Sequence, residues 1–230
     1  MLLLFPLLFS CSMADDATAN ALDATGAPQY KKSAASPAYD AAGIAQNEIM
    51  EAFIAHGDTA STIGATLKLA AARAAALPGF NALAETGYLS PSEMRIAYLT
   101  DGVPGRLDDV IFHSALSDKA KLSLTNFCAG LSYCQSQKQD YGTIMTFIAS
   151  YEASILADAT FGSRDQKVLL VAASLSVHAF KFAETRKKRK PRDRDWDISV
   201  GHIAIAIDLG EGPPATLALA CATALLQENH

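Results

Sequence analysis

Alanine makes up about a fifth of this 230-residue chain, and this excess constrains the fold more than any other feature of the sequence. Alanine is the strongest helix former, because it loses no side-chain entropy in a helix and buries no polar group. Half of the residues are hydrophobic and only 19% are charged. This balance disfavours disorder of the whole chain and supplies enough apolar side chains for a core. The composition therefore predicts an all-α globular protein.

Apolar residues recur at spacings of three and four along several segments, as they do on one face of an amphipathic helix. The clearest stripe lies between Lys138 and Asp158. The segment from Ser163 to about Phe182 is apolar over most of its helical circumference, which is typical of a central helix in a bundle. We therefore expect an irregular bundle of about five to seven helices in a domain that spans residues 39–230.

Capping residues and helix breakers divide the domain into separate helices. Asp58 or Thr59 fits the N-cap of a helix that ends before Pro78. Ser90 to Glu93 has the pattern of a capping box and opens a short helix, and Ser117 caps a further one.

The segment 199–209 fits two patterns. Ile203, Ile205 and Ile207 alternate with alanines, which is typical of a strand. Val200, Ile203 and Ile207 also share one helical face. A single strand is unstable without a partner, and the chain offers none of comparable quality, so the helix is favoured.

The N-terminus has the pattern of a lipoprotein signal peptide. Its apolar run is far shorter than the roughly 20 residues that span a bilayer as a helix, so residues 1–10 are interpreted as a signal peptide. Residues Leu8 to Cys11 resemble a bacterial lipobox, which predicts that Cys11 is acylated. The usual Lys or Arg before the apolar run is missing. Under the alternative, translation starts at Met13 and the protein is cytoplasmic.

Residues 11–38 are rich in Ala, Thr, Ser and Pro and carry too little apolar surface to order themselves, so a flexible tether is expected. The acidic pair Asp15 and Asp16 resembles the signal that sends Bacteroidota lipoproteins to the outer face of the outer membrane. The predicted location is a lipid-anchored, surface-exposed position in the cell envelope.

A dense basic run follows the predicted central helix, although the whole chain is acidic with a net charge of −5. Such a run can bind an anionic surface by charge neutralisation. It can also be a solvated loop whose first cations complement a helix dipole. No aromatic residues interleave with the charges, so nucleic acid is an unlikely partner. The candidate residues for binding an anionic surface are Arg186, Lys187, Lys188, Arg189, Lys190, Arg192 and Arg194.

The remaining titratable residues form no recognisable catalytic or metal motif. The five histidines lack the four-residue spacing that places two ligands on one helical face, so no metal and no cofactor are predicted. Cys128, Cys134 and Cys221 are interpreted as buried free thiols. His202 and Asp208, both within an apolar segment, are the one polar pair that stands out.

Three groups of residues, in a fixed order along the chain, carry a family resemblance. They are Gly43, Gln46 and Asn47; then Glu152, Ser154, Ser163, Asp165, Lys167, Leu169, Leu170, Ala173, Ser174, Phe180 and Phe182; then Trp196, Gly201, Asp208 and Gly210. Together they resemble a family of uncharacterised lipoproteins and secreted proteins of Bacteroidota, in which histidine tends to stand at the position of Gln46. The resemblance covers most of residues 40–225 and implies fold and location but no activity.

These observations predict a cell-envelope lipoprotein that is a non-enzymatic interaction or structural protein. Its partners would be the membrane, through the lipid anchor, and an unknown protein or other envelope component. One alternative is a membrane-active or antagonistic protein that inserts residues 200–226 as a hairpin, although each arm has only about twelve residues against the roughly 20 required. A second alternative is a hydrolase around His202 and Asp208 with an unrecognised nucleophile.

Overall fold

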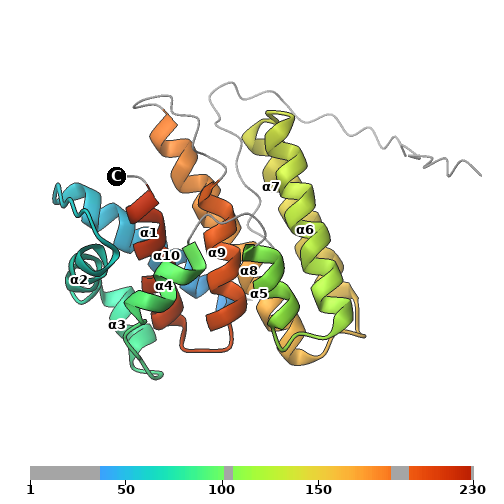
Figure 1. Cartoon of the computed structure of the whole chain (residues 1–230), viewed down its shortest axis with the longest axis horizontal. Helices are drawn as coiled ribbons and strands as arrows, with labels where there is room; N and C mark the ends of the chain where they lie inside the picture. The colour runs from blue at the N-terminus through green and yellow to red at the C-terminus, as the bar shows by residue number, and fades with distance from the viewer. Residues whose placement is uncertain (1–36, 101–105, 188–196, 229–230) are drawn as a thin grey trace, which may run out of the picture.

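The computed structural model describes residues 37–100, 106–187 and 197–228, and these residues form ten α-helices with no strand among them (Figure 1). The all-α prediction is therefore confirmed. The helices are α1 (Pro37–Ala55), α2 (Ile63–Ala74), α3 (Pro78–Ala84), α4 (Glu93–Thr100), α5 (Arg106–His113), α6 (Asp118–Ser136), α7 (Tyr141–Ala157), α8 (Ser163–Lys187), α9 (Asp197–Leu209) and α10 (Pro214–Glu228).

The expected number of five to seven helices is too low. Three of the ten helices, α3, α4 and α5, have only seven or eight residues. Helix α4 is the short helix predicted after Ser90, whereas segments as short as α3 and α5 leave little periodicity in a sequence. Helix α2 ends at Ala74, before Pro78, as predicted, and Pro78 occupies the first turn of α3. Proline is tolerated there because the first turn does not use its missing N–H group.

The capping residues agree in part with the sequence pattern. The hydroxyl of Ser117 accepts a hydrogen bond from the Ala120 N–H and caps α6, as predicted. The N-cap of α2 is Thr62, rather than Asp58 or Thr59. The Asp58 carboxylate instead accepts two hydrogen bonds from Arg73 at the end of α2, and these bonds lower the pKa of Asp58.

Helices α8 and α10 lie in the centre of the molecule (Figure 1). Every residue from 168 to 179 of α8 and from 215 to 226 of α10 is buried, which confirms that the segment after Ser163 is a central helix. Helix α9 packs against both, and its observed helical conformation confirms the preferred interpretation of residues 199–209. Helix α1 also packs on α8 and α10, so these four helices contribute most of the core.

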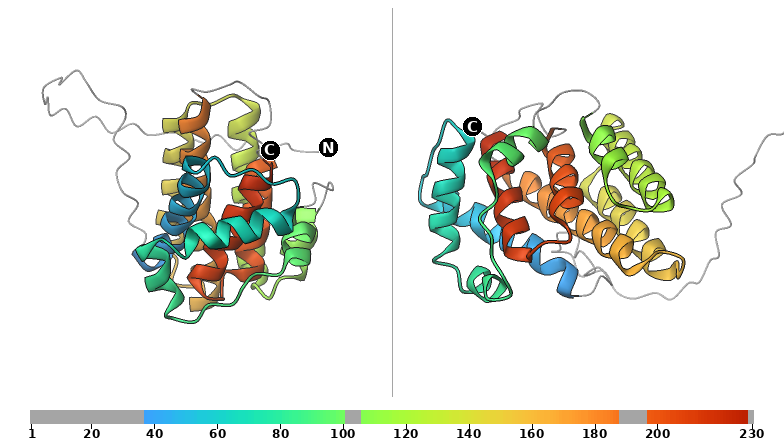
Figure 2. Two further views of the ribbon diagram at one scale, coloured as in Figure 1. Left: turned by 90° about the vertical axis from the view of Figure 1, so that its left-hand side faces the viewer. Right: turned by 60° about the horizontal axis from the view of Figure 1, so that its bottom comes forward.

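Two peripheral helix pairs flank this centre. Figure 2 shows α2 and α3 on one side of the molecule and α6 and α7 on the other. Among the described residues, no helix has both the length and the apolar character that crossing a membrane requires.

Helices α6 and α7 form an antiparallel hairpin that packs on α8. The rings of Phe147 and Tyr151 stack on Phe127, with centroid distances of 5.8 and 4.2 Å. Lys119 at the start of α6 donates a hydrogen bond to Asp158 just after α7. That bond is the main cause that lowers the pKa of Asp158 from 3.8 to about 2. Because the folded-state pKa is depressed, this contact stabilises the hairpin above the ordinary pKa and is lost as the pH falls towards 2.

We predict that Leu170→Ala, at a fully buried position of α8, lowers the free energy of unfolding by about 2–5 kcal/mol, because it leaves a cavity in the core. Leu89→Ala is the matched control, since Leu89 is 70% exposed and lies outside the core, and it should change the stability by less than about 0.5 kcal/mol. Urea denaturation followed by circular dichroism measures both values. Equal effects of the two variants would contradict the described core.

Candidate functional site

A polar cluster joins α1 to α8 within a mainly apolar contact. The Nε2 atom of His178 lies 2.8 Å from Oδ1 of Asp40, and its Nδ1 atom lies 3.1 Å from Nδ2 of Asn47. The hydroxyl of Ser174, one turn before His178, donates to the same Asp40 oxygen at 2.9 Å. Ser174 and His178 are both buried. Four side chains from two helices thus meet at one point.

The direction of these hydrogen bonds limits the chemistry of the cluster. In the neutral imidazole, Nε2–H donates to Asp40 and Nδ1 accepts from the Asn47 amide, so both ring nitrogens are engaged. In a nucleophilic triad, the imidazole accepts a proton from the hydroxyl. Here Ser174 donates to the carboxylate instead. The arrangement therefore holds α1 against α8 and does not activate Ser174.

Gly43 allows α1 to approach the imidazole closely. A Cβ atom at this position would lie 2.3 Å from Cδ2 of His178, a separation that no side chain could tolerate without a shift. Gly43 and Asn47 lie one helical turn apart and present the same face of α1 to His178. Gln46, which belongs to the same sequence group, is fully buried. The first group of residues in the family resemblance, Gly43, Gln46 and Asn47, therefore lies in a region of helix α1 that packs against α8.

We predict that Gly43→Ala destabilises the protein by about 1–3 kcal/mol through overpacking, although alanine is the better helix former by about 1 kcal/mol. Gly162→Ala, just before α8, is the control for the added methyl group, since nothing lies within 4 Å of its Cβ, and it should cost less than Gly43→Ala although alanine is a weaker N-cap than glycine. In a His178→Ala background, the same Gly43→Ala change should become neutral or stabilising, because the clashing ring is gone. Chemical denaturation of the four variants measures this coupling. A destabilisation by Gly43→Ala that persisted without the ring would count against the described contact.

The polar pair expected in the C-terminal segment is not brought together. Asp208 accepts two hydrogen bonds from Arg95 of α4, and these bonds raise the pKa of the guanidinium. His202 is buried on α9. Six helical residues rotate the direction of a side chain by about 240° and separate the two residues by about 9 Å along the axis. The ion pair of Asp208 links α9 to α4, so the partner of this carboxylate is Arg95 on another helix.

Cys128, Cys134 and Cys221 are free thiols, as predicted, although Cys128 is only partly buried. Desolvation, followed by the nearby Asp108 carboxylate, raises the pKa of Cys128 to about 12, and desolvation also raises the pKa of Cys221. Both groups are therefore protonated at neutral pH and are poor nucleophiles. Within the described ranges, no group of three or more His, Cys, Asp and Glu residues could hold a metal ion.

The residues predicted for lipidation and for anionic-surface binding lie mainly outside the described part of the chain. Cys11 is outside it, as are Lys188, Arg189, Lys190, Arg192 and Arg194. Arg186 and Lys187 are the last two residues of α8, which continues five residues beyond the expected end at Phe182.

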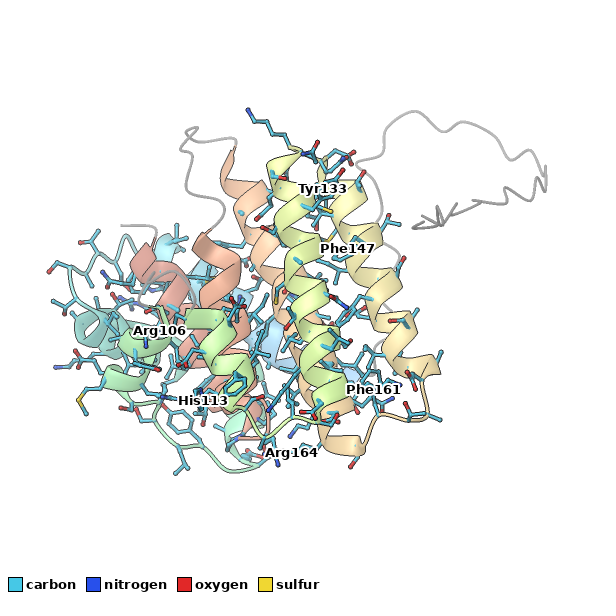
Figure 3. The ribbon with its side chains drawn as sticks, turned by 45° about the vertical axis from the view of Figure 1, so that its right-hand side comes forward. Arg106, His113, Tyr133, Phe147, Phe161 and Arg164 are labelled. Atoms are coloured by element: carbon cyan, nitrogen blue, oxygen red, sulfur yellow. The ribbon has the colours of Figure 1, made fainter. Side chains whose placement is uncertain are left out.

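The outward surface of the α6–α7 hairpin carries no charge over most of its length. Between Lys121 and Lys138 the sequence has no ionisable Asp, Glu, Lys, Arg or His residue, and between Asp140 and Asp158 only Glu152, which is buried. Figure 3 shows α6 at the front of the α6–α7 hairpin, with Tyr133 towards one end of the helix. We define the hairpin face by its exposed residues: Leu122, Thr125, Asn126, Ala129, Tyr133, Ser136, Thr143, Thr146, Ser150, Ala153, Ser154, Leu156 and Ala157.

Several hydroxyl groups of the hairpin face are already hydrogen-bonded within their own helix. Ser136 and Ser154 donate to carbonyl groups three residues earlier, and Thr146 and Ser150 to carbonyl groups four residues earlier. A polar group that keeps its partner can leave water at little cost, whereas a buried donor without a partner costs about 1–3 kcal/mol. Another surface can therefore cover the hairpin face without leaving these hydroxyl donors unpaired.

Other large apolar side chains are exposed on α4 and α5 but lie among charges. Met94 is 82% and Phe112 is 71% exposed. Met94 directly precedes Arg95, and the charged Asp108 and Asp109 share α5 with Phe112. Isolated apolar residues of this kind are ordinary on protein surfaces. The hairpin face differs because it is continuous and uncharged over two long helices.

The apolar periodicity of the sequence predicted the buried stripe of α7, but it did not indicate the hairpin face on the opposite side of the helix. The signal was available as the lack of charged residues in 122–137 and 141–157. Its meaning depends on the fold, because uncharged residues become a surface only where nothing covers them. Comparison with protein-family models, with curated proteins and with solved structures found no match for this chain.

Proposed function

We propose that this chain is a lipid-anchored protein of the bacterial cell envelope, of the kind found in Bacteroidota, and that its helical domain is a non-enzymatic interaction module. In this proposal the acylated Cys11 and the tether 11–38 hold the domain at the outer membrane. The hairpin face docks a partner. The basic run from Arg186 to Arg194 would meet anionic lipids or other phosphate-bearing envelope components.

The observation that carries the interaction role is the uncharged hairpin face. Exposed helices of an ordinary monomer carry charged residues, as α1, α2, α4 and α5 do here. A contiguous surface without charge is typical of a protein–protein contact, because charged groups are depleted at the centres of interfaces. Leu122 and Tyr133 protrude from this surface, with exposed fractions of 63% and 64%. Tyrosine is one of the residues that most often dominate binding energy.

The two alternative functions receive less support from the packing. Insertion of residues 200–226 into a membrane would need side chains that α9 and α10 contribute to the core, since Ile205 and Leu219 are fully buried. That activity would therefore require the domain to open. A hydrolase built on His202 and Asp208 would require the ion pair between Asp208 and Arg95 to break.

The lipid anchor is tested by fractionating cells of a Gram-negative host that express the tagged wild type or Cys11→Ala. We expect the wild type in the membrane pellet, where protease added to intact cells degrades it, and the variant in the soluble fraction. Cys128→Ala is the control, because it removes a thiol that the domain keeps protonated. Wild type and Cys11→Ala together in the cytosol would overturn the anchor and favour translation from Met13.

The docking role is tested with a photo-crosslinking amino acid at Ser150, near the middle of α7 on the hairpin face. We expect crosslinked species in intact cells, because a covered surface brings partner atoms within reach. The same amino acid at Ala72, an exposed residue of α2, is the control and should give none. If Ser150 gives no crosslinked species above the level at Ala72, the hairpin face has no partner and the docking role is wrong.

A further inference from the structure

We infer that the partner of the hairpin face is a second copy of this chain, whose α6 packs antiparallel on α7 of the first copy and whose α7 packs on α6, so that the two hairpins complete a four-helix bundle. This inference rests on the proposed docking role of the same surface. Three features of the described residues support it: the spacing of the exposed side chains, the size of the face and the placement of charges around it.

The exposed side chains follow two parallel seams with the spacing of a helix-packing surface. On α6 the seam consists of Leu122, Asn126, Ala129, Tyr133 and Ser136, with steps of four, three, four and three residues. On α7 it consists of Thr143, Thr146, Ser150, Ala153 and Ala157, with steps of three, four, three and four residues. Alternating steps of three and four place the side chains along one line of a helix and suit packing against another helix at about 20°.

The sizes of these side chains also fit a helical partner. The seam of α7 has only small residues, which let a second helix approach closely, whereas the seam of α6 has two large ones, Leu122 and Tyr133. A copy turned about a two-fold axis parallel to the helices can set the large side chains of one α6 over the small residues of the other α7. Large residues opposite small ones give the interdigitation that bundle cores require. A two-fold contact uses the same patch on both subunits. The hairpin face contains both the large side chains of α6 and the small residues of α7 that such a contact pairs.

The area of the face approaches what a dimer interface requires. At 1.5 Å per residue, the 19 residues of α6 and the 17 of α7 span about 25–28 Å. Two adjacent helices, each about 10 Å wide, then present on the order of 500 Å² in projection, and more as accessible surface because the side chains are corrugated. Stable dimers bury about 800 Å² on each partner. The hairpin face is close to this requirement and supplies most of such an interface.

The charged residues around the face lie at its two ends, with Asp118 and Lys121 at one end and Lys138 and Asp140 at the other. The chain has a net charge of −5, and two copies therefore repel each other in general. The uncharged face is where an acidic copy can approach at the least electrostatic cost.

Sedimentation equilibrium of the full chain in mild detergent tests this inference. We expect a mass that rises with concentration to twice that of the monomer. Ala153→Arg, which places a charge in the centre of the α7 seam, should weaken the dimer by tenfold or more, because an unpaired charge would be buried. Ala72→Arg, an equal change on exposed α2, should leave the association constant unchanged. Circular dichroism must show that both variants keep the helical fold, as expected at exposed positions.

A second variant makes the test independent of one substitution. Ala129→Arg charges the α6 seam and should weaken the dimer as Ala153→Arg does. A monomer at every concentration, or a dimer that both variants leave intact, would overturn the second copy as partner. Crosslinking at Ser150 to a species of another mass would have the same consequence while leaving the docking role in place. No crosslinked species at Ser150 would instead contradict the docking role itself.

Discussion

Close packing of small side chains around α10 is the constraint on which the other helices depend. Ala215, Ala218 and Ala222 are fully buried, as are Ala204 and Ala206 of α9. An alanine at a helix contact lets two backbones approach more closely than a leucine would, and it still removes apolar surface from water. The helices α1, α2 and α9 can therefore all pack on α10.

This interior restricts the positions at which the outer helices can pack. Helices α8 and α10 bury their whole circumference over twelve residues each, so they need neighbours on all sides, which α1, α7 and α9 supply for α8. The hairpin of α6 and α7 closes one flank with its apolar stripe. Its other side then faces outward without charge. The feature that favours a docking role is thus a consequence of how the core is covered, combined with a sequence that places no charges there.

The polar cluster at His178 has a different role in the same interior. Burying an imidazole, a hydroxyl and an amide carries a cost unless their hydrogen bonds are made. Asp40 and Asn47 provide these bonds for His178, Ser174 donates to Asp40, and Gly43 provides the space. Such bonds are directional, whereas alanine contacts are not, so the cluster can fix the register of α1 along α8. Small apolar contacts alone would specify that register poorly.

The helical class, the central position of the segment after Ser163 and the N-cap at Ser117 can all be predicted from the amino-acid sequence. These properties follow from local propensity, periodicity and capping chemistry, which neighbouring residues encode together. The sequence also favoured the helix at 199–209, because a strand there lacked a partner. Cys11 and most of the basic run lie outside the described residues and remain predictions. Three features depend on how distant helices pack: Asp208 pairs with Arg95, Gly43 and Asn47 meet His178, and the uncharged sides of α6 and α7 form one face. Residue pairs such as Asn47 and His178 are 131 positions apart in the chain, and no local pattern encodes which distant helix will cover a given side chain.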